Sequence, residues 1–277
     1  MRIDSHQHFW RFDARRDAWI TEEMRVIRRD FLPDDLLPEL QANRMDGCVA
    51  VQADQSEAET QFLLELAQDR EQIRGVVGWV DLRAANLMER LEYYSQFAKL
   101  RGFRHIAQSE PDDRFLEREN FVAGIRQLRP FDFTYDILIY PRHLPAANRL
   151  VEQLPHQRFV LDHLAKPEIR NRTMEPWAQQ IRRLAEKPNV WCKLSGMTTE
   201  ADWKAWRKDD FTPYLDVIFE AFGVDRIMFG SDWPVCLVAG TYRDVRNLVS
   251  DYVHAMSANE QEKVFGRNAE SFYALSK

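Results

Sequence analysis

Residues 133–165, FTYDILIYPRHLPAANRLVEQLPHQRFVLDHLA, contain the repeating unit that decides the fold. The stretch begins with an apolar run typical of a β-strand, 133–140, and ends with a second one, 158–165. Between them, residues 144–154 carry apolar side chains at helical spacing. A strand, a helix and another strand in this order predict two parallel strands, because the helix returns the chain to the same end of the sheet.

The same alternation extends outward in both directions from this unit. Further strand-like runs occur at 2–9, 47–53, 75–82, 102–108, 189–196 and 226–232. Together these make eight strands, each followed by a segment with helical spacing; the segment at 56–70, for example, begins with Ser56 as a predicted N-cap and Glu59 three residues later. Eight strand–helix units predict an α/β protein with a (β/α)8 TIM barrel, formed as one domain over residues 1–277. A doubly wound open sheet is the alternative, but its glycine-rich G-x-G-x-x-G turn does not occur.

Composition narrows the possible partners. The 277 residues are 45% hydrophobic and carry a net charge of −6, which argues against a nucleic-acid-binding surface. No apolar run approaches the roughly 18 residues of a membrane-spanning helix, and the N-terminal residues lack a signal-peptide pattern. The three cysteines are far apart and form no C-x-x-C pair, so we expect neither a disulfide framework nor a thiolate zinc site. A reducing cytoplasm is the expected compartment.

One connection is much longer than the others. Residues 10–33 separate the first strand from its helix, on the barrel face where active sites are built. Long loops in compact domains are commonly lids or binding loops, so 10–33 is a candidate lid; a structural insertion is the alternative.

Candidate catalytic side chains occur at the ends of three predicted strands. In the first strand, Asp4, His6 and His8 are two residues apart and are therefore expected to project to one face. Histidine is the commonest metal ligand, so the pair His6 and His8 suits a divalent metal. His163 ends the sixth strand and Asp232 ends the eighth, and the carboxyl ends of barrel strands converge on one pocket. Taken separately, His163 has an alternative role as a core histidine and Asp232 as a helix cap.

Three motifs that contain these residues, DSHQHFW (4–10), DHLAKP (162–167) and GSDWPVC (230–236), resemble the amidohydrolase superfamily in its amidohydrolase-2 branch. Segments at 29–40, 51–67, 100–116, 194–203 and 265–275 extend the resemblance over nearly the whole chain. Within the branch, these interior segments are most similar to sugar-acid lactonases of the L-fuconolactonase and L-rhamnono-γ-lactonase type. Pyrone-dicarboxylate lactonases are more distant.

The resemblance implies a role for each residue that matches the motifs. His6 and His8 match the first-strand metal ligands, His163 matches the sixth-strand histidine, and Asp232 matches the last-strand aspartate that handles the proton. We therefore expect one divalent ion, with Zn2+ favoured, held by His6, His8 and Asp232, and catalysis by Asp232 and His163. Metal-free catalysis stays open, because some lactonases of this branch are believed to work without metal.

The fifth strand departs from the metal-using decarboxylases of the branch, which have a histidine there. Its end offers Tyr140, with Asp136 deeper in the strand and His143 beyond it. The strand also lacks a lysine, so a binuclear centre with a carbamylated lysine is not expected.

The leading functional prediction is hydrolysis of a sugar-acid lactone, a small molecule, to the aldonate. Asp232 can take a proton from water and return it to the departing alkoxide, while a metal polarises the carbonyl. Without a metal, His6, His8 or His163 can donate hydrogen bonds to the oxyanion instead. No G-x-S-x-G nucleophile motif competes with this scheme. A decarboxylase of the same branch and a non-catalytic metabolite-binding barrel are the alternatives.

Substrate-binding candidates lie near other strand ends. They are Gln52, Arg104, His105, Gln108, Lys166 and Trp233, since amides, cations and aromatic faces suit a polyhydroxylated sugar. Because neighbouring side chains of a strand alternate, only one of Arg104 and His105 can face the barrel interior. For each of the six, a structural role is the alternative.

Overall fold

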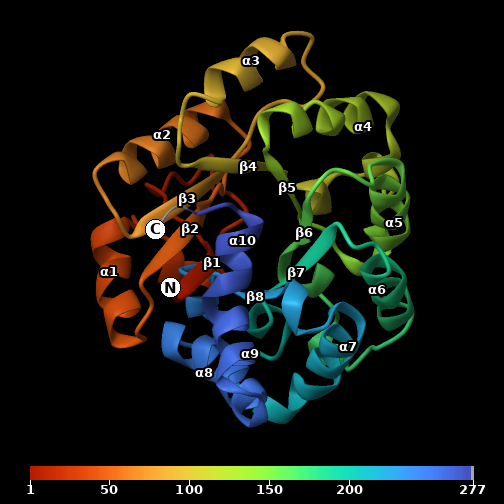
Figure 1. The fold of residues 1–277 in the computed structure, drawn as a ribbon. Helices are drawn as coiled ribbons and strands as arrows, with labels where there is room; N and C mark the ends of the chain where they lie inside the picture. Colours follow the sequence, from red (N-terminus) through yellow and green to blue (C-terminus); the bar gives the residue numbers. More distant parts are fainter. Residues whose placement is uncertain (276–277) are drawn as a thin grey trace.

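A computed structural model of the protein describes residues 1–275 and shows eight parallel strands in the order β1 to β8. The strands are β1 (Ile3–Gln7), β2 (Gly47–Val51), β3 (Ile73–Gly78), β4 (Leu100–His105), β5 (Thr134–Ile137), β6 (Phe159–Leu161), β7 (Val190–Leu194) and β8 (Ile227–Phe229). Each strand pairs with the next one along the chain, and a helical segment follows each strand on the outside (Figure 1). The predicted (β/α)8 barrel is confirmed.

The helices form a ring around the strands (Figure 1). They are α1 (Pro33–Ala42), α2 (Glu57–Gln68), α3 (Leu87–Tyr94), α4 (Glu119–Arg126), α5 (Leu144–Gln153), α6 (Trp177–Ala185), α7 (Thr212–Phe222), α8 (Tyr242–Tyr252), α9 (Ala258–Glu262) and α10 (Asn268–Phe272). Ser56 caps α2 as predicted, because its side chain accepts a hydrogen bond from Glu59 N. Among the described residues, no helix combines the length and hydropathy needed to cross a membrane.

The barrel closes between β8 and β1 at the carboxyl end of these strands. Asp232 N donates to His6 O at 2.8 Å, and His8 N donates to Trp233 O at 2.7 Å. The hydrogen bonds that close the barrel are therefore formed by the backbone of His6, His8 and Asp232, which the sequence predicts as site residues. These bonds hold the three side chains next to one another.

The interior of the barrel is apolar toward its amino-terminal end. Ile3, Val49, Val77 and Met228 pack there, and Phe272 of α10 joins them. Figure 1 shows α10 crossing this end of the barrel, beside which both termini lie. The closed bottom leaves the opposite end of the barrel as the one that can receive a ligand.

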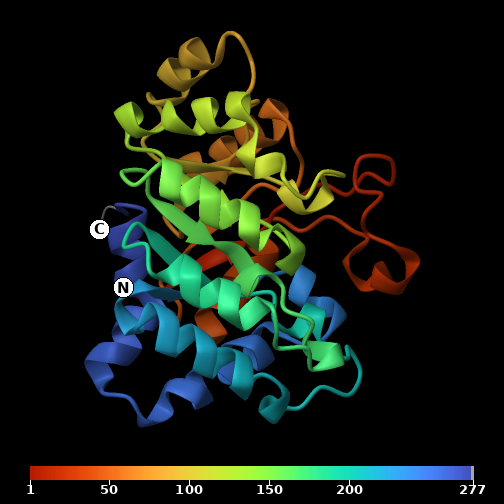
Figure 2. The ribbon, with the colours of Figure 1, turned by 90° about the vertical axis from the view of Figure 1, so that its right-hand side faces the viewer.

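The loop at residues 10–33 projects from that opposite end. In Figure 2 it is the red segment on the right, and the termini lie on the left. Trp10 and Phe31 pair through their backbones at its base, and a 3-10 helix, Glu22–Ile27, forms its outer part. Ile20 and Ile27 are buried, whereas Trp19 remains 43% exposed. The loop is thus an ordered structure with its own apolar contacts.

Candidate active site

A pocket of about 460 Å³ lies at the carboxyl end of the barrel. His8, His163 and Asp232 contribute to its lining, together with Trp19 and Met24 of the long loop. His6 is fully buried next to this pocket, with its ring centroid 4.9 Å from that of His8 and 4.4 Å from that of His163. The structure therefore brings together the four side chains that the sequence predicts as catalytic or metal-binding.

Three potential ligand atoms converge beside the pocket. His6 Nε2 lies 3.2 Å from His8 Nε2, and Asp232 Oδ1 lies 3.4 Å from His8 Nε2 and 3.9 Å from His6 Nε2. His8 Nδ1 lies 2.7 Å from the carbonyl oxygen of Val51, which can only accept a hydrogen bond. Nδ1 of His8 consequently carries the proton in the neutral ring, and its Nε2 presents a lone pair to the other two atoms.

This donor set fits a zinc ion. Ligands arranged tetrahedrally around Zn2+ at about 2.0–2.1 Å are about 3.3–3.4 Å apart. The two distances from His8 Nε2, 3.2 Å and 3.4 Å, are close to this value, and the distance between His6 Nε2 and Asp232 Oδ1 is longer, at 3.9 Å. Two imidazole nitrogens and a carboxylate are also the ligand types that zinc takes in catalytic sites. Furthermore, His8 donates from Nδ1 to a backbone carbonyl, as metal-binding histidines commonly do. The residues present can therefore hold one divalent ion between His6, His8 and Asp232.

A left-handed turn presents His163 to the pocket. Residues 163–166 have φ values of 53°, 56°, 58° and 50°, and none of them is glycine. Each such residue costs about 1–2 kcal/mol, and strain of this kind is found mainly at functional sites. Gly196 makes room for the ring, because a Cβ atom at that position would lie 2.5 Å from His163 Nδ1. The Ser195 hydroxyl lies 2.8 Å from the same nitrogen. When the hydroxyl donates to Nδ1, the proton of the neutral His163 ring is on Nε2.

Burial and neighbouring charges set the protonation of these groups. Burial lowers the pKa of His163 to about 4 and holds the pKa of His6 well below its usual range. Burial also raises the pKa of Asp232, but the surrounding histidines, His163 first, outweigh it and hold that pKa below its usual range. At neutral pH the site therefore combines an ionised Asp232 with neutral His6 and His163.

A buried cluster of charged side chains contacts His6 on the side of its ring that faces the barrel interior. Lys193 Nζ lies 2.5 Å from Asp136 Oδ2, 3.0 Å from Asp162 Oδ1 and 3.1 Å from His6 Nδ1, and all of these side chains are fully buried. Asp162 also binds Arg104 at 3.0 Å. Burial raises the pKa of Asp162, but Lys193 and His6 outweigh it and hold the pKa well below its usual range. His6, Asp162 and His163 form a second possible metal-binding group, but its carboxylate is already ion-paired with two cations.

Lys193 and Asp162 were not among the predicted site residues. A signal for Lys193 is present in the sequence, because it is a charged residue within the strand-like run 189–196, and parallel strands buried on both faces are otherwise mostly apolar. Asp136 breaks the run 133–140 in the same way. Their pairing joins β5 and β7, which are not adjacent strands, and it depends on the closed barrel.

The predicted substrate-binding residues divide into two groups. Arg104, Gln108 and Lys166 line the pocket. Gln52, His105 and Trp233 are not part of its lining. The last three are buried and packed elsewhere, and each has a structural partner.

Each of these three partners explains why the side chain stays away from the pocket. Gln52, which follows β2, donates to Arg104 O of β4 at 3.0 Å and so links two strands that are not adjacent. His105 faces outward, because alternation along β4 points Arg104 inward; its ring stacks on Phe115 at 4.8 Å. Trp233 packs edge-on against Phe31 of the long loop, with ring centroids 5.1 Å apart.

The segment that follows the fifth strand contributes Leu138 and Tyr140 to the pocket. Asp136, within the strand, lies instead in the buried cluster of charged side chains. His143 is buried and approaches Asp113 at 3.5 Å, outside the pocket lining.

The predicted common face of Asp4, His6 and His8 is wrong for Asp4. The register of β1 against β2 shifts between Asp4 and Gln7, which breaks the alternation of side chains along the strand. Asp4 instead accepts hydrogen bonds from Ser231 Oγ at 2.6 Å and from the Tyr242 hydroxyl of α8 at 3.0 Å. Its carboxylate ties the outer helix to the strand ends and does not contact a histidine ring.

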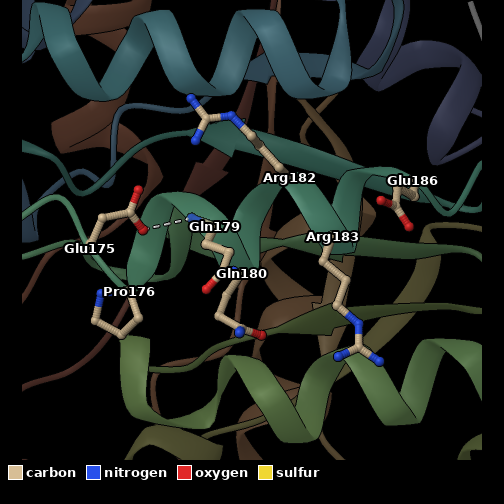
Figure 3. Close-up of a pocket in the computed structure, with 7 residues that line it drawn as sticks. All are labelled: Glu175, Pro176, Gln179, Gln180, Arg182, Arg183 and Glu186. Atoms are coloured by element: carbon tan, nitrogen blue, oxygen red, sulfur yellow. Dashed lines mark hydrogen bonds between the residues drawn. The ribbon is translucent and has the colours of Figure 1, made fainter.

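A larger depression, of about 770 Å³, lies on the outer side of α6. Its lining consists of Glu175, Pro176, Gln179, Gln180, Arg182, Arg183 and Glu186 (Figure 3). Glu175 accepts from Gln179 N, while Arg182 and Arg183 pair with carboxylates of neighbouring helices. These groups are already matched by partners and lie on the outer helical layer, so the smaller pocket at the barrel mouth is the candidate active site.

Comparison with known proteins identifies relatives that match nearly the whole chain. An L-fucono-1,5-lactonase from Burkholderia multivorans is 43% identical over 99% of this chain and 96% of its own length. A second L-fucono-1,5-lactonase, from Burkholderia ambifaria, is 34% identical over 100% of this chain and 96% of its own. A crystal structure of an amidohydrolase from Burkholderia multivorans with bound zinc is 43% identical and matches with a TM-score of 0.96 over 100% of both chains.

More distant structures share the fold alone. A 5-carboxyvanillate decarboxylase from Novosphingobium aromaticivorans is 16% identical, with a TM-score of 0.70 over 99% of this chain and 96% of its own. The family profile described as amidohydrolase matches residues 3–275. Because this match spans nearly the whole described chain, the protein belongs to the amidohydrolase family.

Proposed function

We propose that this protein is a hydrolase that opens a sugar-acid lactone to the corresponding aldonate. The observation that carries the proposal is the ionised Asp232 beside neutral histidines in a pocket that Arg104, Gln108 and Lys166 also line. Two L-fucono-1,5-lactonases that match nearly the full chain support it and suggest L-fuconolactone as the first substrate to test, followed by L-rhamnonolactone.

Asp232 is the proposed general base and acid. Its carboxylate is ionised at neutral pH and sits at the end of β8, with its Oδ1 3.4 Å from His8 Nε2. It accepts a proton from the attacking water, and it returns that proton to the ring oxygen when the carbonyl carbon–oxygen bond breaks. One residue thus serves both proton transfers, which leaves the net protonation of the enzyme unchanged.

His163 is the proposed hydrogen-bond donor to the oxyanion. Its pKa of about 4 keeps the ring neutral, and the Ser195 hydroxyl at 2.8 Å orients Nδ1 so that Nε2–H remains available. A preorganised donor of this kind contributes about 3–4 kcal/mol to transition-state stabilisation. The left-handed turn and Gly196 fix the ring before substrate binds.

His6, His8 and Asp232 are the proposed ligands of one Zn2+, as their distances and the zinc-bound relative support. A bound zinc ion would supply Lewis-acid polarisation of the lactone carbonyl and lower the pKa of water. Elemental analysis of protein purified with added zinc is expected to find about one equivalent, and less than a tenth of an equivalent in His8→Ala. Equal zinc content in both proteins would rule out this site, and full activity after chelation would show that the histidines act without the metal.

The whole chain, 1–277, is proposed to act as one domain, with the loop 10–33 as a lid over the pocket. Trp19 and Met24 support this role because they line the pocket from the loop. The cytoplasm is the proposed compartment, in keeping with three buried cysteine thiols.

A panel of substrates tests the reaction. Acid release from aldonolactones is followed with a pH indicator and corrected for spontaneous opening of each lactone; amides, phosphate esters and aromatic carboxylic acids complete the panel. We expect rapid hydrolysis of five- or six-membered aldonolactones and little reaction elsewhere. An inert lactone panel, with CO2 release from a carboxylic acid, would establish a decarboxylase instead.

A further inference from the structure

Two oppositely charged side chains that the proposed proton transfers do not use face the same pocket. Lys166, in the loop after β6, and Glu200, in the loop after β7, both contribute to its lining. Lys166 Nζ lies 3.6 Å from Glu200 Oε1, and the side chains retain exposed fractions of 16% and 22%. A separation of 3.6 Å is beyond hydrogen-bond distance, so each group keeps hydrogen-bonding capacity for a third partner.

The backbone holds this pair in place beside the reacting groups. Lys166 is the last residue of the left-handed turn that begins at His163, and Lys166 N donates to His163 O at 2.7 Å. One short turn therefore sets both the oxyanion donor and the ammonium group. Lys166 Nζ also lies 5.5 Å from the centroid of the Tyr140 ring, which limits where the ammonium can move.

The two pocket cations are already balanced by carboxylates. Lys166 faces Glu200 at 3.6 Å, and Arg104 binds Asp162 at 3.0 Å. A substrate carboxylate placed beside Lys166 would therefore meet repulsion from Glu200. At this position of the pocket the pairing favours a neutral group of the substrate.

Hydroxyl groups of a ligand can form hydrogen bonds with the pocket groups that remain available. A carboxylate accepts a hydrogen bond from a hydroxyl, and an ammonium group donates one to a hydroxyl oxygen, so neighbouring hydroxyls of a sugar can bridge Glu200 and Lys166. Gln108 adds an acceptor from the loop after β4: within residues 1–275 its buried Oε1 has no hydrogen-bond partner. A ligand without hydroxyls would leave these polar groups unpaired, which is a strong source of discrimination.

We propose that Glu200 and Lys166 form the subsite that selects a neutral, polyhydroxylated lactone, with Glu200 as the specificity-determining residue. This inference rests on the proposed lactonase function and deepens it. Glu200 serves twice, since it binds a substrate hydroxyl and neutralises Lys166 against substrate carboxylates.

The first test compares two lactones with the same ring. We expect Glu200→Leu to lower kcat/KM for L-fucono-1,4-lactone by at least about a hundredfold and to change kcat/KM for γ-butyrolactone, which has no hydroxyls, by less than about threefold. Glu186→Leu, on the outer side of α6, is the matched control and is expected to change neither value. An equal loss with both lactones, or no loss with either, would overturn the inference.

The second test predicts a gain. Glu200→Gln keeps a hydrogen-bonding side chain but leaves Lys166 without its carboxylate, so a lactone that carries a carboxylate should gain at least about tenfold in kcat/KM relative to L-fucono-1,4-lactone. A purely structural role for Glu200 would produce no such shift in preference, and an unchanged preference would contradict the charge-balancing role.

A binding measurement separates this inference from the proposed reaction. A polyhydroxylated lactam, which the enzyme does not open, is titrated calorimetrically into the wild-type protein, Glu200→Leu and Glu186→Leu. At least about tenfold weaker binding by Glu200→Leu alone would support the subsite even if every lactone were inert. Equal affinity in all three proteins would refute the subsite even if lactones were hydrolysed.

Discussion

Replacing Asp232 by asparagine is the sharpest test of the proposed chemistry. The amide has nearly the same shape but cannot accept a proton from water, while the side chain it replaces is only 6% exposed and lies 3.4 Å from His8 Nε2. Loss of a general acid–base group lowers turnover by about 10²–10⁴, which corresponds to about 2.7–5.4 kcal/mol in the activation barrier. We therefore expect kcat for the best lactone to fall at least about a hundredfold.

The experiment must distinguish loss of proton transfer from loss of bound zinc and from unfolding of the variant. Proton release is followed at 25 °C with and without added zinc, and the zinc content of both proteins is determined, because Asp232 is also a candidate ligand. Thermal unfolding followed by circular dichroism checks that the variant remains folded. Asp81→Asn is the matched control, since Asp81 lies in the loop after β3, pairs with Arg83 and is not part of the pocket lining. An Asp232→Asn variant that is folded and keeps a third of wild-type turnover would remove Asp232 from the proton transfers.

Three further predictions concern the lid, the barrel closure and pH. Trp19→Ala should raise KM for the best lactone severalfold and leave kcat within about twofold, because Trp19 lines the pocket from the exposed loop; a fall in kcat alone would argue against a binding role. Asp4→Ala leaves four buried donors of Ser231, Tyr242 and the His6 backbone unpaired and should lower the free energy of unfolding in urea by at least about 3 kcal/mol; a loss below about 1 kcal/mol would contradict this account. Burial lowers the pKa of His163 from 6.5 to about 4. Between these pH values the unfolded chain binds a proton at His163 and the folded protein does not. The contribution of His163 to the free energy of unfolding should therefore decline as pH falls from about 6.5 to 4. Urea unfolding of the wild type and of His163→Gln between pH 4 and pH 7 measures this contribution, and the same pH dependence in both proteins would contradict it.

Some site residues are fixed by which face of a strand their side chains point to. The sequence predicts that side chains alternate between the two faces, but it does not say which set points inward. Alternation along β4 allows either Arg104 or His105 to face inward, and the structure selects Arg104, which binds Asp162 across the barrel. In β1 the register shift after Asp4 changes the parity, so a strict period of two placed Asp4 on the wrong face. Sequence alternation cannot show such a shift, since it depends on how the strand pairs with its neighbour.

The sequence by itself determined the eight strand–helix units and the convergence of His6, His8, His163 and Asp232, because both follow from local periodicity. Apolar spacing of two or 3.6 residues is a property of neighbouring residues, and parallel strands necessarily bring their carboxyl ends to one rim.

Only the tertiary structure decided what supports and surrounds these four residues. Lys193 meets Asp136 across 57 positions of sequence and His6 across 187, through the closed interior of the barrel. Lys166 meets Glu200 because an unusual left-handed turn aims it toward the loop after β7. Such contacts depend on strand register, barrel closure and backbone strain, and these arise from the packing of the whole chain, which no local pattern of residues encodes.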